Sequence, residues 1–312
     1  MSIPASQNRR RLWVVVGATG TGKTALSLDL AERFCSEHGI AAEIVNADAM
    51  QFYRGMNIGT AKLPENERRG IPHHLFDALD VTEEATVAWY QPTARAVIER
   101  IHDRDRDAIL VGGSGLYVSS VVFDFAFPPR DEALRVQLEQ EVEQQGVEGL
   151  LARLRQLDPD AASAVDARNP RRVVRALEVA LLGGNARVTL PEQPQLWHGD
   201  THIVGARLER AALVDRLDRR VEQMWAGGLL AEVESLIGEG IERGKTASRA
   251  IGYAQALAQL RGERNQREAV EETQALTRRY ARRQVSWFKR YAGVQWLEAG
   301  ARAAELPKPI DG

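Results

Sequence analysis

Polar residues suited to phosphate chemistry lie in an eight-residue loop near the amino terminus. The loop reads Gly17-Ala18-Thr19-Gly20-Thr21-Gly22-Lys23-Thr24, a complete G-x-x-x-x-G-K-T motif. Its glycines let successive backbone N–H groups turn toward one anion at the start of a helix, where the helix dipole adds to the attraction. In this motif Lys23 neutralises the terminal phosphates and the Thr24 hydroxyl faces a magnesium ion. We therefore expect a phosphate or diphosphate site with Mg²⁺ at this loop.

A second group of reactive side chains lies in the segment from Asp48 to Lys62, after the next apolar run. Asp48 directly follows that run, so we expect its carboxylate to reach the same cleft as the phosphates. There it can hold magnesium through a water molecule or accept a proton from a nucleophile, and the alternative is a cap for the turn that follows. Gln51 offers a donor and an acceptor to a base edge, and Tyr53 offers either a ring for the cleft or ordinary core packing.

The turn after the third apolar run is rich in glycine and carries one hydroxyl. Residues 112–115 read Gly-Gly-Ser-Gly, at a place where a conventional P-loop ATPase has an acidic magnesium ligand. The missing acid weakens the ATPase interpretation. The glycines permit a bulky group to approach the backbone beside Ser114, and a plain turn is the alternative.

Arginines gather in three places where they can contact phosphates. The groups are Arg171, Arg172 and Arg175; Arg216, Arg219 and Arg220; and the mixed basic and aromatic run from Arg278 to Arg290. The first follows Asn169-Pro170, which is typical of a helix start, and places its arginines on one helix face. Such patterns suit RNA phosphates and stacked bases. The alternative is a solvated helix face for the first group, and an ordinary amphipathic helix with buried Trp and Phe for the last.

Alternating strands and helices must position these groups. Apolar runs at 12–16, 43–46, 108–111 and 203–208 predict four strands, separated mostly by helical patterns. This order indicates an α/β fold with a P-loop nucleoside-triphosphate-hydrolase-like parallel sheet flanked by helices. Ligands of such sheets bind beyond the carboxyl ends of the strands, so the P-loop, Asp48 and the glycine-rich turn should converge on one cleft.

The strand pattern is interrupted in the middle of the chain. From residue 129 to residue 192 only helical spacing is found, which predicts a helical insertion domain; residues 1–128 and 193–312 then form the core with its C-terminal helices. We expect those C-terminal helices at about 213–225, 229–237, 250–260 and 267–290.

Composition excludes several classes of protein. The 312 residues are 44% hydrophobic and 27% charged, with a net charge of −2, so an RNA contact needs a local basic patch. Cys35 is the only cysteine, which rules out an internal disulfide, and we expect it to be buried on the first helix. No apolar stretch approaches the roughly 20 residues of a membrane span. We expect a cytoplasmic protein without membrane contact.

Taken together, these segments resemble the bacterial tRNA dimethylallyltransferase (tRNA isopentenyltransferase) family, over nearly the whole chain. The matching pieces are 17–24, 48–62, 72–75, 111–117, 169–179, 228–240, 246–253 and 278–290. The resemblance implies transfer of a dimethylallyl group from dimethylallyl diphosphate to N6 of the adenosine 3′ to the anticodon (position 37), in tRNAs that read codons starting with U. It further implies a monomer whose partners are the tRNA anticodon stem-loop and dimethylallyl diphosphate.

The resemblance also assigns roles to residues. Lys23, Thr24 and Mg²⁺ would stabilise the diphosphate leaving group, Asp48 would take the proton of the amine, and Thr19 would orient the reacting groups. Arg216 matches an arginine that the family places near the diphosphate. The family's tRNA contacts correspond to Asp48, Ala49, Met50, Gln51, Ser114, Arg135, Arg171, Arg172 and Arg175. Many relatives have Ser where this chain has Ala49, so no side-chain role is assigned to Ala49.

Two other interpretations stay open. A P-loop kinase, or a prenyltransferase for free adenine nucleotides, would share the phosphate loop. A small substrate such as a free nucleotide would not need the insertion or the basic last helix. A nucleotide-gated RNA-binding module without catalysis would not need Asp48 at the end of a strand.

Overall fold

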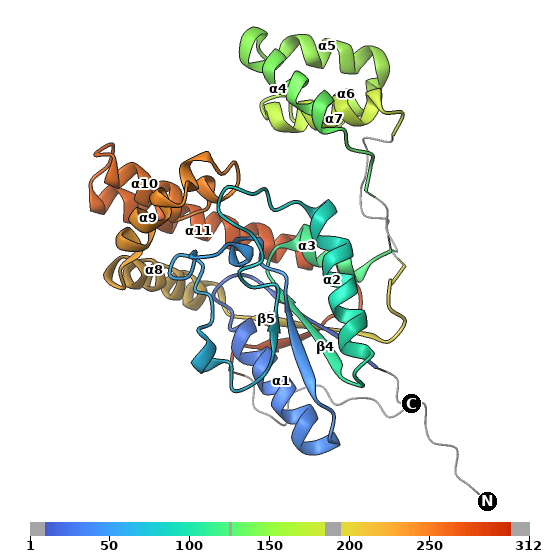
Figure 1. Cartoon of the computed structure of the whole chain (residues 1–312), viewed down its shortest axis with the longest axis vertical. Helices are drawn as coiled ribbons and strands as arrows, with labels where there is room; N and C mark the ends of the chain where they lie inside the picture. The colour runs from blue at the N-terminus through green and yellow to red at the C-terminus, as the bar shows by residue number, and fades with distance from the viewer. Residues whose placement is uncertain (1–9, 125–126, 185–194, 301–312) are drawn as a thin grey trace, which may run out of the picture. The chain divides into compact units, whose positions relative to one another are not determined.

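The computed structural model describes residues 10–124, 127–184 and 195–300 of the chain. The backbone divides into two compact units, one made of Met1–Phe123 with Leu196–Gly312 and the other of Asp124–Gln195. Figure 1 shows both units, coloured along the chain.

The first unit is built on a parallel sheet. Within the described ranges its strands are β1 (Leu12–Gly17), β2 (Ala42–Asn46), β3 (His73–His74), β4 (Asp107–Gly112), β5 (Thr201–Arg207) and β6 (Gln295–Glu298), in the order β3-β2-β4-β1-β5-β6. All five pairings are parallel, which confirms the predicted fold class. The sequence pattern does not predict β3 and β6, because these short edge strands contain no apolar run.

The order of the strands locates a crevice at their carboxyl ends. The chain leaves β1 toward β2 on one side and leaves β4 toward β5 on the other, although β1 and β4 are neighbours. Where the connections of adjacent strands run in opposite directions across the sheet, α/β proteins bind ligands in the crevice outside the carboxyl ends of the strands. The P-loop follows β1 and the glycine-rich turn follows β4, so both border this crevice.

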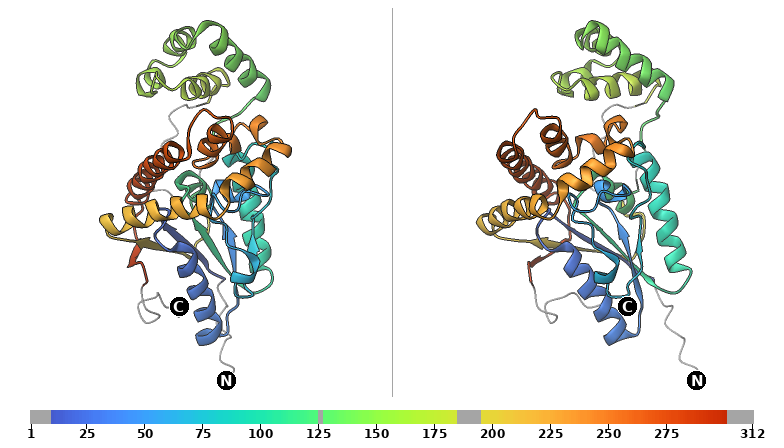
Figure 2. Two further views of the ribbon diagram at one scale, coloured as in Figure 1. Left: turned by 90° about the vertical axis from the view of Figure 1, so that its left-hand side faces the viewer. Right: turned by 60° about the vertical axis from the view of Figure 1, so that its left-hand side comes forward.

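Helices cover both faces of the sheet. Helix α1 (Lys23–His38) packs Leu30 and Phe34 against Trp13 and Val15, and helix α2 (Val87–His102) covers the opposite face (Figure 2). Because side chains alternate along a strand, β1 presents side chains to both faces of the sheet, and it is buried throughout. Cys35 is exposed, contrary to the expectation that it is buried, because it lies on the face of α1 that turns away from the sheet.

Further helices gather at the carboxyl end of the sheet (Figure 1). They are α3 (Gly115–Val122), α8 (Arg210–Ala226), α9 (Leu229–Gly238), α10 (Tyr253–Leu260) and α11 (Gln266–Phe288), with the 3₁₀ turns η1 (Ala49–Phe52), η2 (Glu65–Glu67), η3 (Ile241–Arg243) and η4 (Ala247–Arg249) in the loops. The predicted C-terminal helices are present, but α10 begins three residues later than expected. Helix α11 starts with a capping box, in which the side chains of Asn265 and Glu268 each accept from the other's backbone N–H at 3.0 Å.

The second unit is entirely helical in its described residues. It consists of α4 (Glu132–Gln145), α5 (Glu148–Leu157), α6 (Pro159–Ala164) and α7 (Pro170–Leu181). Its core includes Leu138, Leu154 and Leu177, which are fully buried. In the described part of the chain, no helix is both long and apolar enough to span a bilayer.

Candidate functional site

The P-loop connects β1 to α1 and folds back on itself. Gly17 has a φ of 147°, and a Cβ there would lie 2.4 Å from the Ala206 carbonyl oxygen, so only glycine fits. Thr21 Oγ1 donates to the Ala18 carbonyl at 2.8 Å, and Lys23 Nζ donates to the same oxygen at 2.9 Å. These two bonds hold the loop in a ring, with Lys23 curled back over it.

Lys23 lies in an environment that weakens its hold on a proton. Burial lowers the pKa of Lys23 to about 8, against the attraction of the Asp48 carboxylate, and the charge of Arg220 lowers it further. Two cations and one carboxylate from three distant segments are therefore close enough to interact at one place. An arriving diphosphate would balance the excess positive charge and keep Lys23 protonated.

Asp48 is positioned by Asn46, a buried residue that sequence reasoning missed. Asn46 Oδ1 accepts from the Asp48 N–H at 3.0 Å, while its Nδ2 donates to the carbonyls of Asp48 and Leu75. Asp48 Oδ1 accepts from the Met50 N–H at 3.1 Å, so Asp48 also caps the turn η1. The only sequence signal for Asn46 was its place at the end of β2. The cap uses one carboxylate oxygen of Asp48 and does not use the second.

Arg220 joins the P-loop to the loop after Asp48. Its Nη1 donates to Thr19 Oγ1 and its Nη2 to the Thr60 carbonyl, both at 3.2 Å. Burial lowers the pKa of Arg220, against the attraction of Asp48, and the charge of Arg216 lowers it further. Arg216 itself is exposed on α8, one turn earlier. Of the two, the structure brings Arg220 into contact with the P-loop.

The turn after β4 completes this cleft. Ser114 Oγ accepts from the Ala49 N–H and contacts the Tyr280 hydroxyl, both at 3.4 Å. Burial raises the pKa of Tyr280 to about 12, so its hydroxyl stays neutral. The structure thus brings Ser114 beside the Asp48 turn, as the glycine-rich sequence suggested. Tyr280 comes from α11, whose pattern alone could not show which residues face the cleft.

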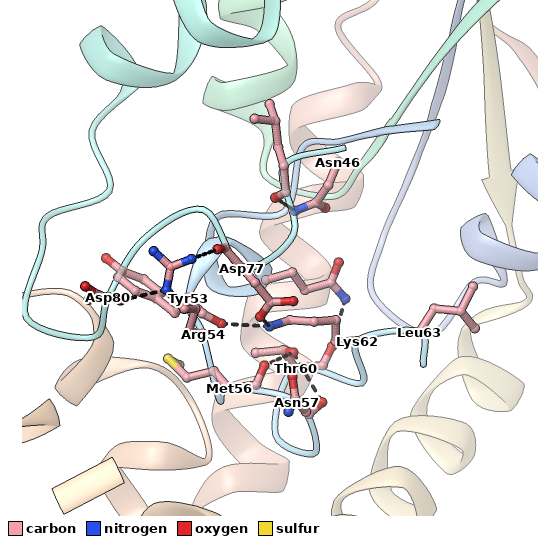
Figure 3. Close-up of polar contacts among 12 residues, drawn as sticks. Asn46, Tyr53, Arg54, Met56, Asn57, Thr60, Lys62, Leu63, Asp77 and Asp80 are labelled. Carbon is pink, nitrogen blue, oxygen red and sulfur yellow. Dashed lines mark hydrogen bonds and ion pairs between the residues drawn. The ribbon is translucent and has the colours of Figure 1, made fainter. Parts of the chain in front are cut away.

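The loop from Tyr53 to Lys62 is a structural support, with its polar contacts shown in Figure 3. Tyr53 is fully buried, and its hydroxyl donates to the Glu83 carbonyl. Of the two roles considered for Tyr53, this burial matches ordinary core packing. Lys62 Nζ donates to the Tyr53 carbonyl at 2.7 Å and to Asp77 at 2.6 Å, and it is buried. Gln51 Nε2 donates to the Thr60 carbonyl at 3.2 Å. This loop therefore presents Thr60 to Arg220.

A carboxylate on α9 holds the far end of that loop. Glu232 accepts from the backbone N–H groups of Asn57 and Ile58, at 3.1 and 2.7 Å, and from the Tyr253 hydroxyl at 2.5 Å. Gly59 packs on the Tyr253 ring so closely that a Cβ would lie 2.4 Å from it. The sequence offered no sign of this pairing, since the two segments lie far apart in the chain.

The arginines of the second unit fall into two kinds. Arg175 donates to the carbonyls of Pro128 and Pro129 and pairs with the buried Glu178 at 2.7 Å, so it holds its own unit together. Arg135 pairs with Glu139 along α4 at 3.3 Å. Arg171 and Arg172 are exposed on the first turn of α7. Of the four predicted contact arginines named here, these two are the exposed ones.

The cleft suits a magnesium ion that is shared with a phosphate ligand. In the described ranges, no group of three or more His, Cys, Asp or Glu residues could hold a metal. Mg²⁺ commonly uses one or two protein oxygens, several waters and the phosphates of the substrate, so such a cage is not required. The exposed Thr24 hydroxyl at the start of α1 and the Asp48 carboxylate provide oxygens of the right kind.

Comparison with known proteins agrees with this architecture. The model of the family described as IPP transferase matches residues 51–291. The chain is 59% identical to the tRNA dimethylallyltransferase of Clavibacter sepedonicus over 285 residues, which cover 91% of this chain and 92% of the relative. It is 50% identical to that of Thermobifida fusca (strain YX) over 284 residues, covering 91% and 88%.

Solved structures lead to the same family. The tRNA isopentenylpyrophosphate transferase from Bacillus halodurans aligns with a TM-score of 0.66 and 39% identity, covering 93% of this chain and 90% of that one. A eukaryotic dimethylallyltransferase, described as acting on tRNA, aligns with a TM-score of 0.77 and 29% identity, covering 93% and 74%. From the family match and these relatives, we conclude that the chain belongs to the IPP transferase family.

Proposed function

We propose that this protein transfers a dimethylallyl group from dimethylallyl diphosphate to N6 of adenosine 37, next to the anticodon of tRNAs that read codons beginning with U. The observation that carries the proposal is the contact of Arg220 with Thr19 of the P-loop at 3.2 Å, at a place where the charge of Asp48 acts on both Arg220 and Lys23. A carboxylate beside a diphosphate cradle suits a reaction that releases diphosphate and a proton at the same place.

The chemistry follows from these positions. The allylic C–O bond breaks and its electron pair leaves with the diphosphate, whose growing charge meets the P-loop N–H groups, Lys23 and Arg220. The N6 lone pair of adenine attacks the allylic carbon, and one N6 proton passes to Asp48 as the C–N bond forms. Thr19, which Arg220 holds by its hydroxyl, fixes the loop near the reacting carbon.

A divalent metal fits the same assignment. Thr24, and Asp48 through water, would hold Mg²⁺ against the diphosphate, where the ion would neutralise charge on the leaving group. Lys23 and Arg220 would supply the protein's own positive charge to the same diphosphate. No acid at the end of β4 is needed, because the reaction activates no water molecule.

The tRNA must present its adenosine outside the base stack, because a stacked base cannot reach the phosphate loop at the end of the sheet. We assign the backbone contacts of the anticodon stem-loop to Arg171 and Arg172, and the base contacts to the Asp48–Gln51 turn and Ser114. One chain contains every group named here, so we propose a monomer that works in the cytoplasm, where tRNA is found.

Incubation with Mg²⁺, labelled dimethylallyl diphosphate and unmodified tRNA tests the proposal, with AMP and ATP as parallel acceptors. We expect label on tRNA alone, and at the adenosine 3′ to the anticodon after nuclease digestion. Label on AMP or ATP would instead assign a free-nucleotide prenyltransferase. No label on any acceptor, with tRNA binding retained, would replace the proposal with a binding module.

A further inference from the structure

The buried side chain of Gln284 on α11 connects the two loops that border the cleft. Its Oε1 accepts from the Thr19 N–H at 2.7 Å, and its Nε2 donates to the Gly113 carbonyl at 2.8 Å. Only one orientation of the amide satisfies both partners, because Thr19 offers a donor and Gly113 an acceptor. Only 4% of this residue is exposed, so neither contact can be exchanged for water without cost.

The two partners of Gln284 belong to opposite sides of the crevice. Thr19 lies in the P-loop after β1, and Gly113 lies in the turn after β4, next to Ser114. The fit is close, since a Cβ at Gly113 would lie 2.4 Å from Gln284 Nε2. The amide therefore acts as a spacer of fixed length between the diphosphate cradle and the turn that borders Asp48.

We propose that Gln284 is a positioning residue, which sets the separation between the leaving diphosphate and the attacking amine through its bonds to Thr19 and Gly113. The proposal rests on the proposed function, because it concerns the geometry of that same site. A displacement of about 1 Å between reacting groups can lower a rate by roughly 10²-fold without abolishing binding. Gln284 should thus affect kcat much more than KM.

Gln284→Glu tests this with almost no change of shape. When ionised, the introduced carboxylate would still accept from the Thr19 N–H but would repel the Gly113 carbonyl, whereas the protonated acid would make both bonds. Burial and the bond to Gly113 favour the protonated form, whereas the Thr19 N–H and the Tyr280 hydroxyl, which also contacts residue 284, favour the carboxylate. We expect burial to dominate, so the pKa of the introduced acid should lie above the usual range for Glu. We therefore expect the ratio of the variant's kcat to the wild-type kcat to be about 10- to 100-fold below one near pH 8. The ratio should rise toward one as the pH falls to about 5.5.

The neighbouring polar groups Lys23, Asp48 and Tyr280 are present in both proteins, so taking the ratio of kcat to wild type removes their contribution. Gln284→Met, which has similar length and no polar end, should show a low ratio at every pH. Gln266→Glu adds the same charge at the exposed start of α11 and should stay near one throughout. KM for dimethylallyl diphosphate should change less than about threefold in all three variants.

Three results would overturn the proposal. They are a Gln284→Glu ratio that does not change with pH, a folded Gln284→Met variant with wild-type kcat, or losses confined to KM. If Gln284→Glu does not fold, the Met variant decides the matter alone. Wild-type protein without any transfer activity would count against the proposed function instead. In that case urea unfolding tests the bonds of Gln284 to Thr19 and Gly113, because Gln284→Glu should lose stability relative to wild type as the pH rises from about 5.5 to about 8.

Discussion

Replacing Arg220 should show which arginine of α8 acts on the diphosphate. Family resemblance points to Arg216, whereas the geometry favours Arg220, which contacts Thr19 and Thr60 at 3.2 Å. A guanidinium has five N–H donors, and these two contacts leave three for a ligand in the cleft. Arg220 is therefore fixed in place before the substrate arrives, which is the condition for strong stabilisation of a developing anion.

From the structure we expect different losses of kcat when Arg220 and Arg216 are replaced. Removal of one preorganised donor to a developing oxyanion typically lowers kcat by about 10²- to 10³-fold, and we expect this for Arg220→Ala. The side chain of Arg216 is exposed, so water screens its charge and Arg216→Ala should cost about fivefold or less. Arg220→Lys should be intermediate, because an ammonium keeps the charge but cannot contact Thr19 and Thr60 as a fork does.

Steady-state kinetics with tRNA and dimethylallyl diphosphate, together with unfolding curves for each variant, would measure these effects. Wild-type stability in Arg220→Ala with a large loss of kcat would support the role in catalysis. A larger loss for Arg216→Ala than for Arg220→Ala would refute the reasoning and return the assignment to the resemblance.

The cleft and the insertion lead to three further predictions. Asp48→Asn keeps an oxygen for the η1 cap but cannot accept a proton, so kcat should fall by roughly 10²-fold or more with unchanged tRNA affinity; wild-type turnover would exclude Asp48 as the base. Because burial lowers the pKa of Lys23 to about 8, its charge is lost as the pH rises through 8, and diphosphate binding measured by calorimetry should weaken by up to about tenfold per pH unit above it. Lys23→Arg does not titrate there, and parallel curves for the two proteins would contradict this. Arg171→Ala combined with Arg172→Ala should reduce the salt dependence of tRNA binding by about 0.7 per lost contact on single-stranded RNA, and an unchanged slope would make both residues part of a solvated face.

Local patterns were enough to predict the parallel sheet and the places where its chemistry lies. A glycine-rich loop after one apolar run, an acid after the next and a Gly-Gly-Ser-Gly turn after the third must meet, because parallel strands end at the same edge. The edge strands β3 and β6 escaped prediction, since their partners and not their own residues keep them extended. Cys35 was misplaced because its type suggests burial, while the position on α1 decides it.

Contacts between distant segments were decided only by the tertiary structure. The sequence by itself determined which groups could bind phosphate, accept a proton or face RNA, because those properties belong to residue types and their spacing. It could not select Arg220 over Arg216, or show that Gln284 spans from Thr19 to Gly113, because each depends on how α8 and α11 pack over the sheet. Helix periodicity specifies an apolar face, but the rotation and height at which that face packs depend on the whole core.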